Sequence, residues 1–201
     1  MVQVEGRGHV APAHVPIRMS VGIVDDCLME ARRRNEHRGY SSSNDEWRKG
    51  LCGDAVLAIQ AGLLGEYGTA YFLNERFGRV VASVDIRTLP GGDGGRDLVV
   101  FEAPLQVKTC RSQTGANLIR VRKANRQPVS FSAVAVVFCD VTDVVVRLRG
   151  WCMWRAIKDL PEVPARRGNH WNIEVDGSLL EPMSALVDAL ESKRLSLEAA
   201  Q

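Results

Sequence analysis

The chain has 201 residues, of which 45% are apolar and 25% are charged, and its formal net charge at pH 7 is +2. This composition is typical of globular proteins, and the length suits one domain with a hydrophobic core. No apolar run approaches the roughly 20 residues that span a bilayer, and the N-terminus lacks the pattern of a signal peptide. These features exclude a membrane-spanning protein, and we expect a cytoplasmic one.

The cysteines and histidines give no sign of a metal or disulfide framework. The five cysteines form no CxxC pair, and their number is odd. Several lie in apolar runs, where a thiol behaves as a small hydrophobic side chain. This usage favours a reducing compartment and argues against a zinc site. The four histidines show no metal-ligand spacing.

The N-terminal part of the chain predicts an arm followed by helices. Glycines and prolines interrupt residues 1–16, which we interpret as a flexible arm. Apolar residues at three- and four-residue steps predict an amphipathic helix over 19–38. A serine cluster at 41–43 offers an N-cap for a second helix that begins near Asp45 and ends at Phe77. Gly78 follows in the position where glycine commonly ends a helix.

The rest of the chain is dominated by strand patterns. Alternating and β-branched segments predict strands over 79–86, 97–101, 105–110, 118–121, 133–139 and 144–148. A short helical stretch after Trp151, an edge strand over 170–175 and a closing helix over 183–193 follow. The order of elements predicts an α/β fold over residues 17–201, in which one central mixed β-sheet is flanked by helices.

Polar side chains gather at the hairpin formed by the second and third predicted strands. Strand alternation places Gln106 and Lys108 on one face and leaves the apolar neighbours on the core face. A tight turn at 102–104 makes the two strands antiparallel neighbours, so Asp97 is expected near Gln106 and Lys108. We therefore expect the amide and the ammonium to face a shared cleft beside this carboxylate.

Such a group suits a magnesium ion, which prefers oxygen ligands at about 2.0–2.1 Å and usually takes one or two carboxylates with waters and phosphate oxygens. Asp97, Glu66 of the second helix, the side-chain oxygen of Gln106 and the carbonyl of Val107 form a possible set. Lys108 would then orient or deprotonate an attacking water, or stabilise charge on phosphorus.

Asp97, a hairpin, and then Gln106-x-Lys108, with Glu66 on the preceding helix, resemble the PD-(D/E)XK nuclease superfamily. The resemblance covers roughly residues 50–155. It implies a restriction-endonuclease-like core and a deoxyribonuclease that depends on Mg²⁺ or Mn²⁺ and leaves a 5′-phosphate. It implies Glu66, Asp97, Gln106 and Lys108 as catalytic residues, with the metal held by the first three side chains and by Val107.

Two positions depart from the family pattern. Gln106 stands where the family usually has a carboxylate, so the site carries one negative charge fewer, and Arg96 stands where a proline usually precedes the aspartate. Each residue also has a structural interpretation. Asp97 can cap a turn, Lys108 can be a solvated strand residue, and Glu66 can be a helix-surface charge.

A basic segment follows the hairpin. Residues 108–126 contain six positive side chains and no acid, although the whole chain is nearly neutral. Such a segment is typical of phosphate binding, although a solvated hairpin has the same pattern. If the partner is DNA, the side chains expected to contact it are Arg111, Arg120, Arg122, Lys123 and Arg126.

Two other functions stay open on the sequence alone. The neutral Gln106 favours a nuclease-fold protein that binds nucleic acid or a protein partner without cutting. A purely structural or assembly role is the third interpretation. A homodimer is a further possibility, because nuclease folds of this size often dimerise so that two sites face opposite strands.

Overall fold

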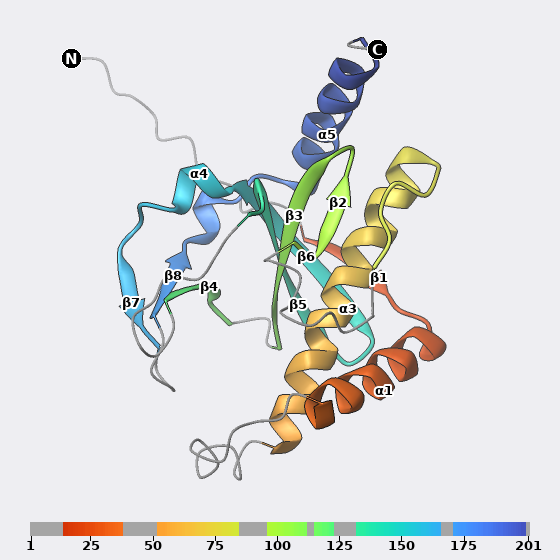
Figure 1. The fold of residues 1–201 in the computed structure, drawn as a ribbon, viewed down its shortest axis with the longest axis vertical. Coiled ribbons are helices and arrows are strands. Elements are labelled where there is room, and N and C mark those ends of the chain that lie inside the picture. Colours follow the sequence, from red (N-terminus) through yellow and green to blue (C-terminus); the bar gives the residue numbers. More distant parts are fainter. Residues whose placement is uncertain are drawn as a thin grey trace, which may run out of the picture.

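The computed structural model describes residues 14–37, 52–84, 96–111, 115–122, 132–165 and 171–199. It has the α/β architecture expected from the sequence, with a central mixed sheet flanked by helices (Figure 1). None of the described helices is long and apolar enough to cross a membrane.

The central sheet has five strands in the order β1-β6-β5-β3-β2. Only β3 and β5 run parallel, and the other neighbours are antiparallel. The strand bounds are Val15–Arg18 for β1, Leu98–Val100 for β2, Ala103–Cys110 for β3, Ala135–Thr142 for β5 and Val145–Met153 for β6. β5 is buried almost throughout, as the strongly apolar sequence predicted.

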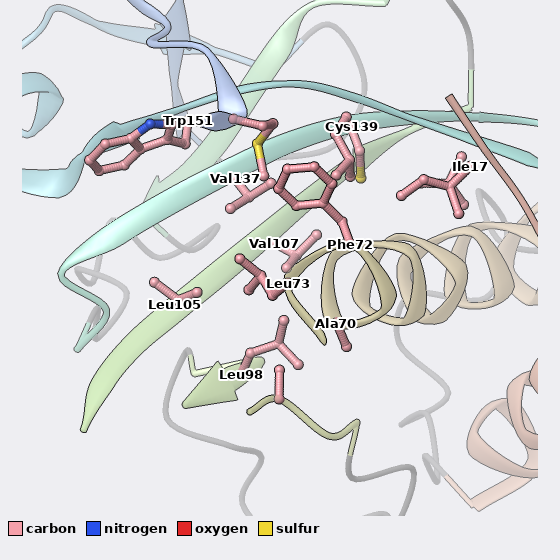
Figure 2. Close-up of a cluster of buried hydrophobic side chains, with 14 of the residues drawn as sticks. Ile17, Ala70, Phe72, Leu73, Leu98, Leu105, Val107, Val137, Cys139 and Trp151 are labelled. Atoms are coloured by element: carbon pink, nitrogen blue, oxygen red, sulfur yellow. The ribbon is translucent and has the colours of Figure 1, made fainter. Parts of the chain in front are cut away.

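Two long helices cover one face of this sheet. Helix α1 spans Val21–His37 and α3 spans Cys52–Phe77, in agreement with the predicted helices where both are described. α3 lies directly on the sheet, and α1 packs on α3 (Figure 1). Figure 2 shows Phe72 and Leu73 of α3 among apolar side chains of β3 and β5. This is the larger of the two hydrophobic clusters.

The opposite face of the central sheet carries a second sheet, which the sequence did not predict. It has the order β4-β8-β7, with β4 at Asn117–Arg122, β8 at Trp171–Val175 and β7 at Glu162–Pro164. Ile119 and Ile173 of this sheet pack against Phe138 of β5. The segment over 170–175 was expected at an edge, but β8 is the middle strand because it pairs with both neighbours.

Two short helices and a longer closing helix complete the fold of the described residues. α4 spans Trp154–Ile157 and follows β6 directly, and the 3-10 helix η2 spans Gly177–Leu179. The closing helix α5 spans Met183–Glu198 and buries Met183, Leu186 and Leu190 in the larger cluster. Its predicted start is confirmed, and its end lies a turn and a half beyond the predicted one.

Three local predictions need correction. Residues 79–84 do not form a strand, because the Asn74 amide bonds the backbone of Val81 and Ala82 at 2.8–2.9 Å where a strand would need a neighbour. The hairpin turn is at Phe101 and Glu102, both with positive φ, as in the type I′ turns that match strand twist. β1 begins at Val15, so the end of the predicted arm is paired in the sheet.

Parts of other predictions lie outside the described residues. These are most of the arm at 1–13, the start of the second helix at 45–51, the end of the first predicted strand at 85–86 and the glycine-rich turn before Asp97.

Candidate functional site

Asp97 lies where β2 begins, and its carboxylate contacts β3. The Asp97 backbone N–H donates to the Leu105 carbonyl at 2.9 Å. Its Oδ2 atom accepts the Val107 backbone N–H at 2.6 Å and a second hydrogen bond from Nε2 of Gln106. The structure thus brings Asp97, Gln106 and Val107 into direct contact.

The strand geometry explains why a side chain takes this position. The Leu105 carbonyl faces β2, so the backbone groups of Val107, two residues on, face the same edge. β2 pairs with β3 only as far as Leu98, opposite Leu105. Beyond that pair no residue of β2 lies opposite Val107, and the Asp97 carboxylate accepts the Val107 backbone N–H in place of a strand carbonyl. The Val107 carbonyl points to the same edge as its N–H.

Gln106 and Lys108 lie on the face of β3 that turns away from α3, as alternation predicted, while Leu105 and Val107 belong to the larger core cluster. Gln106 is not among the residues that line the pocket beside Lys108, and the wider shared cleft stays a prediction. Gln106 is only 5% exposed, because its amide is turned onto Asp97. Lys108 is half-buried.

Lys108 lines a pocket of about 140 Å³ between the two sheets. The other lining residues come from β3, from β5, and from the start of β4 and the residue before it: Thr109, Cys110, Ala116, Asn117, Leu118, Phe138 and Cys139. The start of β4 is anchored, since Nδ2 of Asn117 donates to the Val175 carbonyl at 3.1 Å and Nη1 of Arg149 donates to the Gly115 carbonyl at 2.7 Å.

Glu66 projects from the turn of α3 that touches β3. A Cβ atom at the preceding Gly65 would lie 2.1 Å from Oγ1 of Thr109, so the helix and the strand are in contact there. Phe77 lies on the same face of α3 as Glu66, about three turns further along the helix. Its ring packs edge-on against Phe101, with the ring centroids 5.2 Å apart. Glu66 therefore sits on the α3 side of β3, and Lys108 on the other side.

The negative charge of Glu66 helps to raise the pKa values of two buried thiols. The pKa of Cys139 on β5 is raised to about 12, mainly by burial. A hydrogen bond with Thr109 lowers this pKa, and the negative charges of Asp140 and Glu66 contribute to raising it. Burial also raises the pKa of Cys27 on α1 to about 12, with Glu66 as the next cause. Glu66 thus lies within electrostatic reach of both neighbouring elements, and neither thiol is a nucleophile.

The described ranges contain no group of three or more His, Cys, Asp or Glu side chains that could hold a metal ion. The predicted set has only two carboxylates, Asp97 and Glu66, and neutral oxygens would have to complete it. Asp97 and the Val107 carbonyl fit such a set, because both face one edge of β3. Gln106 fits only after a half-turn of its amide, since Nε2 now faces Asp97.

The predicted nucleic-acid contacts are described only in part. Arg111 and Arg120 are exposed, the first just beyond β3 and the second on β4. Arg122 ends β4, and Lys123 and Arg126 lie outside the described residues.

The sequence did not point to an acid–base pair on the Lys108 face of the sheet. Asp140 is 1% exposed, and its Oδ1 accepts from Nη1 of Arg147 at 3.0 Å, while its Oδ2 has no hydrogen-bond partner among the described residues. Asp140 is also the strand neighbour of Cys110. Asp140 ends an apolar run, and only the pairing of β5 with β6 brings Arg147 beside it.

No family model matches the chain, and comparisons with curated proteins and with solved structures find no match either.

Proposed function

We propose that this protein is a nuclease that hydrolyses DNA phosphodiester bonds with the help of Mg²⁺ or Mn²⁺. The observation that carries the proposal is the contact of the Asp97 carboxylate with Gln106 and Val107, one residue from Lys108 on the same strand. The resemblance to the PD-(D/E)XK superfamily implies a carboxylate beside Gln106-x-Lys108, and this contact and the mixed sheet with flanking helices support the proposal.

In this proposal, Asp97 and the Val107 carbonyl would hold the cation at the edge of β3, Glu66 would reach it from the α3 side, and Gln106 would add its oxygen after the amide turns. When bound, such a cation would supply polarisation of the scissile phosphate and a lowered pKa of bound water. Lys108 orients the attacking water or stabilises charge that develops on the phosphate oxygens. Because the protein supplies only two carboxylates, phosphate oxygens and waters complete the ligand set, as is usual for Mg²⁺.

The test is cleavage of linear, circular and branched DNA in the presence of Mg²⁺, Mn²⁺ or a chelator. We expect cation-dependent cleavage that falls at least about 100-fold in Asp97→Asn and Lys108→Met, the size of loss seen when a preorganised charged group is removed. Asp159→Asn and Lys158→Met are matched controls, because both side chains are exposed and form a surface ion pair with each other at 3.9 Å. Wild-type cleavage by either site variant contradicts the assignment.

A second candidate function is DNA binding without cleavage, and the hydrogen bond from Gln106 to Asp97 favours it. That bond already supplies the carboxylate with a neutral partner. Calorimetric titration with the cation and with DNA distinguishes the nuclease from the binding protein. Salt-sensitive DNA binding without any uptake of Mg²⁺ or Mn²⁺, in the presence of DNA that cannot be cut, identifies a binding protein.

A further inference from the structure

The Asp97 carboxylate is held by two neutral donors of a single strand. Val107 donates its backbone N–H at 2.6 Å, and Gln106 donates its side-chain N–H to the same oxygen, Oδ2. Hydrogen bonds to a charged carboxylate are stronger than those between neutral groups. Because Gln106 is almost fully buried, little water competes for this bond.

Glutamine suits this position because its amide carries a donor and an acceptor on the same carbon. A half-turn of the amide exchanges the two. A carboxylate at position 106 would have no donor and would place a second anion against Asp97, which is unfavourable unless a cation lies between them.

We propose that Gln106 is a positioning residue. Its amide N–H holds the Asp97 carboxylate, and a divalent cation would bind beside Asp97 only when a half-turn of the amide brings the Gln106 oxygen to the position that Nε2 now occupies. The second half of this inference rests on the proposed function, since it assumes a cation at Asp97. The first half rests only on the observed hydrogen bond.

The inference predicts how the cation affects stability. In wild type a cation must displace the hydrogen bond from Gln106 to Asp97, so we expect it to bind weakly. Because stabilisation depends on the ratio of ligand concentration to Kd, Mn²⁺ alone should raise the melting temperature of wild type by no more than about 1 °C. Gln106→Glu removes the donor, and it should melt roughly 5–10 °C lower than wild type in chelator at pH 8. Millimolar Mn²⁺ should restore most of that loss.

Two further variants serve as controls. Gln106→Met keeps the length of the side chain but has neither donor nor charge, so its melting temperature should fall without any recovery in Mn²⁺. Gln60→Glu is the matched control for the charge change, because Gln60 is half-buried on α3 and donates to the Val24 carbonyl at 3.1 Å. It should also show no recovery in Mn²⁺.

Two direct measurements complete the test. By calorimetry, Gln106→Glu should bind Mn²⁺ at least about tenfold more tightly than wild type, since a second carboxylate replaces a neutral amide. By NMR, the side-chain NH₂ signals of Gln106 in wild type should move in Asp97→Asn and on addition of Mg²⁺. The NMR measurement decides the donor role even if Gln106→Glu does not fold.

The inference is overturned if Gln106→Glu is as stable as wild type in chelator, if wild type binds Mn²⁺ as tightly as this variant, or if the Gln106 NH₂ signals do not move in Asp97→Asn. Failure of the proposed function looks different. In that case wild type cuts no DNA under any condition, while Gln106→Glu still loses stability in chelator and regains it in Mn²⁺.

Discussion

Three cysteines on three different elements are buried in the hydrophobic clusters. Cys139 on β5 lies against α3, where its Sγ is 3.2 Å from Oγ1 of Thr109. It is fully buried, as are Cys27 on α1 and Cys152 on β6. Burial raises the pKa of all three from 9.0 to about 12. These cysteines therefore serve as small apolar side chains in the folded protein.

The raised pKa values predict a loss of stability at alkaline pH. Below pH 9 each thiol is protonated in both the folded and unfolded states, and its burial has no electrostatic cost. Between pH 9 and 12 the unfolded chain releases the proton and the folded one keeps it, so the free energy of unfolding falls by up to about 1.4 kcal/mol per pH unit and thiol.

Denaturant unfolding of wild type and Cys139→Ala between pH 8 and 10.5 measures this effect. Above pH 9 the free energy of unfolding of Cys139→Ala should fall less steeply with pH than that of wild type, by up to about 1.4 kcal/mol per pH unit, the contribution of one thiol. Val137→Ala, which shortens a buried side chain on the same strand, should lower the whole curve without changing its slope. Parallel curves for wild type and Cys139→Ala would show that Cys139 stays protonated in both states or ionises in both.

At the level of elements, the position of Glu66 depends on how closely α3 approaches the sheet. Gly65 lets the helix touch β3 and β5, and Gly68 does the same at β6, where a Cβ atom would be 2.7 Å from a methyl carbon of Val146. Glu66 lies between these two contacts. A helix held further from the sheet would carry its carboxylate away from β3.

Gly65→Ala should therefore be destabilising by about 1–3 kcal/mol, as is typical when extra carbon enters a packed core. Gly62→Ala is the matched control, because among the described residues the new Cβ has no neighbour within 4 Å outside its own helix backbone, and alanine in a helix interior is favoured by up to about 1 kcal/mol over glycine. Chemical denaturation should thus show a lower free energy of unfolding than wild type for Gly65→Ala and a higher one for Gly62→Ala. A stabilised Gly65→Ala would mean that α3 can shift on the sheet at little cost.

The sequence predicts the local parts of this fold well. The helix ending at Gly78 and the contact between Asp97 and Gln106 both depend on residues near each other in the chain, where periodicity and hairpin register are informative. The second sheet was missed because Asn117 pairs with Val175, far along the chain. Residues 79–84 were misassigned because the Asn74 side chain bonds their backbone, and no strand pattern reveals such a bond.

At the scale of the whole molecule, a net charge of +2 leaves little long-range attraction for DNA. Binding should then depend on a few local contacts. Each arginine that neutralises a phosphate contributes about one unit to the slope of log affinity against log salt. Arg111 and Arg120 are exposed on elements that adjoin the Lys108 pocket.

We expect Arg111→Ala and Arg120→Ala each to lower the salt slope of DNA binding by about one, measured by fluorescence anisotropy in chelator to prevent cleavage. Arg155→Ala on α4, which is also exposed, should leave the slope unchanged. Equal slopes for all three variants and wild type would place the DNA on another surface.

The pairing of β1 with β6 joins the two most distant strands of the central sheet. Val15 lies opposite Leu148, so 148 − 15 = 133 residues separate them along the chain. On a ribosome that adds roughly 5–20 residues per second, the N-terminal strand waits roughly 7–27 s before its partner has been made. Closure of this edge is therefore a late event in biosynthesis, after α1 and α3 have had time to pair.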